Sequence, residues 1–214
     1  MKQKNKKGIA STELLLVLAF IIVIVAIVAW LFLSNDHNKR KYEVLAENAR
    51  DFSVRVSEYR DKYLKYDDVI YLADLVNNNY IKAFKNPFGG DATCDIYESK
   101  IEIVSNSERY VTLRCGNYLI DRQDTSSNEY KVYKVSDWKD NISDSELVQS
   151  AKLYNYQKDG KNVLSSYVTE KELIDSYNQK ESQDIETIEE IDLKKFAITT
   201  KTFYRTKELV AENL

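Results

Sequence analysis

Histidine, proline, glycine and cysteine are scarce in this chain of 214 residues, which has one histidine, one proline, five glycines and two cysteines. The single histidine, His37, has no second histidine with which to form a metal site, and the sequence supplies no His-based catalytic triad. No glycine-rich phosphate-binding loop is present. The net charge of −3 gives no electrostatic footprint for nucleic acid. We therefore expect no enzyme activity, no cofactor or metal, and no nucleic-acid partner.

One long apolar run stands out, because no charged residue occurs between Glu13 and Asp36. A helix over the 20 residues Leu14–Leu33 would be roughly 30 Å long, the thickness of the bilayer hydrocarbon. Secretory signal peptides have apolar regions of about 7–15 residues, so this run is too long for one. Positive charge stays cytoplasmic, and four lysines precede the run: Lys2, Lys4, Lys6 and Lys7. We expect a single pass through the cell membrane, with a cytoplasmic N-terminus.

A lone carboxylate, Glu13, lies at the start of this run. Burying it costs a few kcal/mol unless it has a partner, so it is a candidate functional residue. Lys6-Lys7-Gly8 precedes the apolar Ile9, and Glu13 is the fifth residue after the glycine. This arrangement resembles the class III signal of type IV prepilins and pseudopilins. The resemblance implies that a prepilin peptidase cuts after Gly8 and that the new amino group of Ile9 is methylated. It departs from the usual pattern at Ile9, where Phe or Met is common, and at Thr12, where an apolar residue is common.

Cleavage after Gly8 suggests a role for Glu13. The cut leaves a cationic amine on Ile9, about one helical turn from Glu13. In a filament of staggered helices, Glu13 of one subunit would neutralise the amine of a neighbour, and the pair would fix their register. The alternative is that Glu13 is an interfacial anchor residue.

The helix is expected to continue beyond the apolar run, from about Ser11 to Tyr63. Apolar and aromatic residues recur at spacings of 4, 3, 4, 3 and 4, which places them on one helical face: Leu45, Ala49, Phe52, Val56, Tyr59 and Tyr63. A short helix should follow, from Asp67 or Asp68 to Val76, and then a turn around Pro87. The stretch LADLVNNNYIKAFKNPFGG resembles the helix and following loop of pseudopilins. Strand-like segments follow: Asp95–Glu98, Lys100–Ser105, Tyr110–Leu113 and Tyr118–Ile120.

The two cysteines, Cys94 and Cys115, both fall in the part expected outside the cell. An even number of cysteines there predicts a disulfide. It would close a loop of about 22 residues, worth roughly 3 kcal/mol in the chain-entropy model. The alternative is two buried free thiols.

The C-terminal part shows further strands and a helix but resembles no family. Strands are expected at Tyr130–Trp138, Ala151–Tyr156 and Phe196–Tyr204, and Thr169 begins a capping box for a helix to about Tyr177. One acidic cluster fits a solvated turn better than a calcium loop, because its spacing is wrong for an EF-hand: Asp137, Asp140, Asn141, Asp144 and Glu146.

The predicted fold class is α+β. A long N-terminal helix, half transmembrane and half amphipathic, would pack on an antiparallel sheet in a pilin-like head, with a C-terminal α+β extension. The expected divisions are a leader (1–8), a transmembrane helix (9–33), the head (34–124) and the extension (125–214).

The sequence predicts a structural subunit, a major or minor pilin or pseudopilin, of a type IV pilus-like filament or a related secretion or uptake machine. The resemblance implies a prepilin peptidase, other pilin subunits, and an assembly ATPase and platform as partners. It also implies that the subunit leaves the membrane for an extracellular filament. The alternative is a membrane-anchored extracellular binding protein that does not polymerise.

Overall fold

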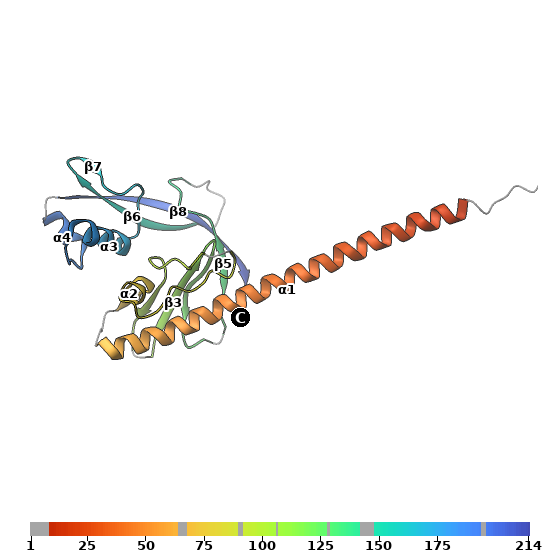
Figure 1. The fold of residues 1–214 in the computed structure, drawn as a ribbon, viewed down its shortest axis with the longest axis horizontal. Helices are drawn as coiled ribbons and strands as arrows, with labels where there is room; N and C mark the ends of the chain where they lie inside the picture. The colour runs from red at the N-terminus through yellow and green to blue at the C-terminus, as the bar shows by residue number, and fades with distance from the viewer. Residues whose placement is uncertain are drawn as a thin grey trace, which may run out of the picture. The chain divides into compact units, whose positions relative to one another are not determined.

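The computed structural model describes residues 9–63, 68–89, 92–105, 107–127, 129–141, 148–193 and 196–214, with the side chains at 9–14, 31–36, 148 and 192–193 left out. Contacts divide the chain into two units, Met1–Lys41 and Tyr42–Leu214. Helix α1 runs from Ile9 to Tyr63 and contributes to both (Figure 1). Among the described residues, no helix is both long and apolar enough to cross a membrane.

The second unit is built on one antiparallel sheet of eight strands, in the order β1-β2-β3-β4-β5-β8-β6-β7. The last strand, β8, lies between β5 and β6 (Figure 1). It pairs with β5 through its C-terminal end and with β6 along most of its length. The strands are β1 (Val69–Tyr71), β2 (Lys100–Ile103), β3 (Arg109–Cys115), β4 (Tyr118–Asp124), β5 (Val132–Val135), β6 (Val148–Lys158), β7 (Lys161–Asn162) and β8 (Ala197–Ala211).

The predicted fold class is therefore wrong. No transmembrane half of a helix is found among the described residues. The C-terminal strands also do not form a separate extension, because β8 joins β5 to β6 and makes one sheet of the two halves. The physical reason is that hydrogen-bonding partners of a strand can come from any distance along the chain, and the alternation within a strand does not specify them.

The first hydrophobic core contains the predicted apolar stripe of α1 from Leu45 to Tyr59. Leu45, Phe52 and Val56 are fully buried in one cluster with alternate residues of β2 and β3, including Ile101 and Leu113. The apolar residues at alternate positions, Ile101 and Ile103 of β2 and Val111, Leu113 and Cys115 of β3, form this face of the sheet. Tyr63, the last residue of the stripe, is exposed.

A second core covers the other end of the sheet. It contains Tyr156 of β6, residues of α3 (Glu170–Glu181), and Ile191 of α4 (Ile188–Leu193). Thr169 caps α3 as predicted, because its Oγ1 accepts the backbone N–H of Glu172 at 3.3 Å. The helix continues to Glu181, four residues beyond the predicted end.

Two local predictions before β2 were wrong. The helix predicted from Asp67 or Asp68 to Val76 begins later than expected. Strand β1 occupies Val69–Tyr71, and helix α2 occupies Leu72–Asn77. The predicted strand Asp95–Glu98 is a turn, because Asp95 Oδ1 accepts the backbone N–H groups of Tyr97 and Glu98, each at 2.9 Å. An aspartate that bonds to the backbone two and three residues ahead stabilises a turn instead of a strand.

Candidate functional site

The predicted processing and assembly residues lie at the limit of what the structure describes. Gly8 lies outside the described residues, and the side chains of Ile9 and Glu13 are also outside them. The backbone of α1 begins at Ile9, the residue that follows the predicted cut. Cleavage after Gly8, methylation of Ile9 and pairing by Glu13 stay predictions.

The predicted disulfide between Cys94 and Cys115 is confirmed, and both residues are buried in the first core. It joins the loop that follows α2 to the end of β3. Cys94 N–H also donates to the carbonyl of Phe84 at 2.8 Å. Gly116 then turns the chain toward β4 with φ +61°, and a Cβ there would lie 2.9 Å from Asn86 Nδ2. The turn therefore favours glycine for its backbone conformation, and a Cβ there would also require the Asn86 side chain to shift.

Replacing both cysteines with alanine should lower the free energy of unfolding of the second unit by about 3 kcal/mol, since the cross-link restricts the unfolded chain. Chemical denaturation of the double variant and the oxidised wild type would measure the difference. Reductant should destabilise the wild type by a similar amount and leave the double variant unchanged. A stability difference below about 1 kcal/mol would contradict this account.

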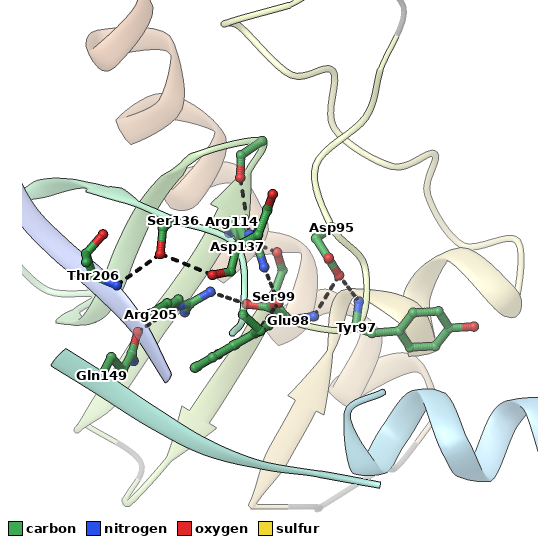
Figure 2. Close-up of polar contacts among 12 residues, drawn as sticks. Asp95, Tyr97, Glu98, Ser99, Arg114, Ser136, Asp137, Gln149, Arg205 and Thr206 are labelled. Atoms are coloured by element: carbon green, nitrogen blue, oxygen red, sulfur yellow. Dashed lines mark hydrogen bonds and ion pairs between the residues drawn. The ribbon is translucent and has the colours of Figure 1, made fainter. Parts of the chain in front are cut away.

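A second feature, which sequence reasoning missed, is an ion-pair cluster around the buried carboxylate of Glu98 (Figure 2). Its Oε1 accepts a hydrogen bond from Arg114 Nη1, as Figure 2 shows. The same oxygen accepts another from Trp138 Nε1 at 2.9 Å. Its Oε2 accepts from Arg205 Nη1 at 2.6 Å. The side chains of Glu98 and Arg114 are 11% exposed, and that of Arg205 is 4% exposed. We call Glu98, Arg114, Trp138 and Arg205 the Glu98 cluster.

Each member of the Glu98 cluster comes from a different part of the fold. Glu98 lies in the turn stabilised by Asp95, and Arg114 lies on β3. Trp138 follows β5, while Arg205 lies on β8. The cluster therefore links the sheet of the first core to the strand shared with the second core.

Arg205 contacts three side chains, those of Glu98, Trp138 and Gln149. Its guanidinium lies 4.2 Å from the ring centroid of Trp138, and its Nε donates to Gln149 Oε1 at 2.8 Å. Desolvation lowers the pKa of Arg205, although the charge of Glu98 opposes that shift. Such a residue needs its carboxylate, because a buried charge without a partner is strongly unfavourable.

A cleft of about 430 Å³ lies beside the Glu98 cluster. One wall carries Lys100, Glu102 and Arg122, which we call the charged wall. Glu102 forms ion pairs with Lys100 at 2.8 Å and with Arg122 at 3.0 Å. Burial raises the pKa of Glu102, but the hydrogen bonds and charges of the two cations outweigh it and leave that pKa below its usual value. The lining of the cleft also includes residues of β6, among them Lys152.

Two described members of the acidic cluster considered for calcium contact basic residues. Asp137 lies 3.5 Å from Arg114, and Asp140 pairs with Lys201. Asp144 and Glu146 lie outside the described residues. Within the described part of the chain, no group of three or more His, Cys, Asp or Glu side chains could hold a metal ion.

The Glu98 cluster could not be found from sequence spacing. The residues that bond to Glu98 are 16, 40 and 107 positions away along the chain. Chemically, the cluster and the cleft offer charged and hydrogen-bonding groups on the sheet, an arrangement suited to recognition. Comparison with family models, curated proteins and solved structures found no match for this chain.

Proposed function

We propose that this chain is a structural subunit of a type IV pilus-like filament or a related secretion or uptake machine. The observation behind the proposal is the run from Lys6 to Glu13, with its basic pair, Gly8, apolar Ile9 and correctly spaced carboxylate. A prepilin peptidase, other pilin subunits and an assembly ATPase with its platform are the proposed partners.

Exposed apolar side chains in the first unit support the same proposal. The large apolar residues of α1 from Leu15 to Trp30 are between 44% and 72% exposed. Contiguous exposed apolar surface marks a site of association with other molecules. We propose that these residues contact neighbouring helices in an extracellular filament, and that the subunit is held at the cell membrane with a cytoplasmic N-terminus before assembly. The disulfide fits an oxidising setting for the second unit.

The mature protein should begin at Ile9 and carry a methylated amine, with 206 residues, that is 214 − 8. Intact-mass and N-terminal analysis of protein from its native host would measure this. Gly8→Val should leave the leader attached, because the peptidase requires the glycine according to the resemblance. A wild-type chain that still carries its lysine-rich leader would overturn the filament proposal.

The competing proposal is a membrane-anchored binding protein that does not polymerise. The cleft beside the Glu98 cluster favours it, because a cleft with charged walls is a place for a ligand. The two proposals differ at the N-terminus, since an anchored protein needs no cut after Gly8.

A further inference from the structure

The second unit contains two hydrophobic cores that share no residue. The second core lies within residues 136–206, which we call the α3 lobe. The first core lies within residues 42–135 and 207–214, which we call the base. A part of a protein that buries its own apolar side chains keeps its internal packing when it turns against a neighbouring part. Two separate cores therefore allow the lobe and the base to move as two bodies.

The chain passes between the base and the α3 lobe at two points. One is between Val135, the last residue of β5, and Ser136, and the other is between Thr206 and Lys207 in β8. The two points lie side by side, because Val135 pairs with Lys207. The Ser136 N–H also donates to the Thr206 carbonyl at 3.3 Å. No residue of β8 pairs with both β5 and β6, so a turn at this place would leave both strand pairings intact.

The Glu98 cluster lies beside this hinge. Trp138 and Arg205 belong to the α3 lobe and are close in sequence to the two crossing points, whereas Glu98 and Arg114 belong to the base. The carboxylate of Glu98 accepts hydrogen bonds from both lobe residues. A contact near the axis of a rotation changes least, so the cluster can serve as the pivot.

The base and the α3 lobe also contact each other between α2 and α3. Lys171 Nζ lies 2.8 Å from Asp74 Oδ1, and Asn77 Nδ2 donates to Asp175 Oδ2 at 3.0 Å. We call these four residues the latch. The side chains of Lys171 and Asp74 are 23% and 26% exposed, and an ion pair that water reaches contributes little to stability. Lys171 would keep a partner within α3 if the latch opened, because its Nζ lies 3.0 Å from Asp175 Oδ1.

Two clefts flank the latch, and each is lined by residues of both the base and the α3 lobe. One is the cleft of about 430 Å³ beside the Glu98 cluster, and the other has a volume of about 560 Å³. Tyr71 of the base lines both clefts, whereas on the lobe Glu170 lines the first and Lys171 lines the second. The two halves therefore meet at the latch through polar side chains, with a cleft on either side.

We propose that the α3 lobe is hinged, that it turns about the Glu98 cluster, and that the latch holds it closed over the two clefts. The structure shows the closed form. Opening requires only the polar contacts of the latch to break, since each half keeps its own core. It would widen the cleft beside the charged wall and so control access to it. The proposal does not depend on cleavage after Gly8, because it concerns only the second unit.

Distances between two spin labels on the full-length chain in detergent would test the hinge. One label replaces Lys82, an exposed base residue that follows α2, and the other replaces Gln179, an exposed residue of α3. Cys94 and Cys115 form the disulfide, so they would not react with the labels.

Lys171→Met combined with Asn77→Ala removes the latch and leaves Asp74 facing Asp175 without a shared cation. The population at longer distances should rise by about fivefold or more. Sodium chloride at about 1 M screens the ion pair and should shift the distances of the wild type in the same direction.

Two controls separate a turn of the lobe from its unfolding. Labels at Lys161 and Gln179 both lie within the lobe, and their distances should stay the same in every variant. Lys180→Met removes another lysine of α3, one whose Nζ donates to the Val163 carbonyl within the lobe at 3.4 Å. It should therefore leave the distances between lobe and base unchanged.

Three results would overturn the proposal. The first is a latch variant with the same distances between lobe and base as the wild type, and the second is an equal lengthening by Lys180→Met. The third is a broader distribution for the label pair within the lobe, since the lobe would then unfold instead of turning. If the latch variant fails to fold, the wild type decides the question, because distances that stay unchanged at about 1 M salt contradict an ionic latch.

Discussion

Glu98→Ala should lower the free energy of unfolding of the second unit by about 3–5 kcal/mol, because it leaves the buried Arg205 without a counter-charge. Arg205 would be affected most, since its side chain is 4% exposed and Glu98 supplies the carboxylate of its ion pair. Trp138 would also lose the acceptor for its indole N–H. Urea denaturation followed by tryptophan fluorescence would measure the change, and Trp138 reports directly from the cluster.

Matched variants separate this effect from a general loss of charge. Glu108→Ala removes an exposed carboxylate that accepts from Tyr110, and should change stability by less than about 1 kcal/mol. Replacing Glu98, Arg114 and Arg205 together with leucine and methionine should recover much of the loss, because an apolar set leaves no buried charge unpaired. A loss below about 1 kcal/mol for Glu98→Ala would show that water solvates the arginines.

Features with a local signature were predictable from the sequence. The stripe from Leu45 to Tyr59 follows helical spacing, so its burial follows from periodicity alone. Thr169 precedes a helix in the usual capping arrangement, and it caps α3. The disulfide followed from an even number of cysteines in a segment expected to be outside the cell.

Features that depend on distant partners were not predictable. The alternation in β8 indicates a strand, but it does not state that this strand will lie between β5 and β6. This is why the predicted fold class separated a head from an extension. The turn at Asp95 was not predicted for another reason. The composition of Asp95–Glu98 is strand-like, but the Asp95 carboxylate accepts the backbone N–H groups that a neighbouring strand would otherwise bind.

The candidate sites divide in the same way. The processing motif from Lys6 to Glu13 is contiguous, so the sequence alone is enough to propose it. The Glu98 cluster exists only after the sheet has formed, because its farthest partner, Arg205, is 107 positions away.

Glu13→Ala should abolish or sharply reduce filament assembly if the proposed function is correct. Each assembled subunit would bury the cationic amine of Ile9 without its counter-charge, a loss of roughly 3–5 kcal/mol for a broken buried pair. The variant should still insert into the membrane, since the change makes the segment more apolar. Cleavage after Gly8 should also persist, because the altered side chain is more than a helical turn from the cut bond.

The yield of sheared filaments, relative to subunit retained in the membrane, measures this effect for each variant. Glu13→Gln should be intermediate, because it keeps a hydrogen-bond acceptor and loses the charge. Glu47→Ala provides the matched control, since it removes an exposed carboxylate from the same helix, and it should assemble like wild type. Normal assembly of Glu13→Ala would mean that Glu13 is an interfacial anchor. The register of the filament would then have to come from packing of the apolar residues between Leu15 and Trp30.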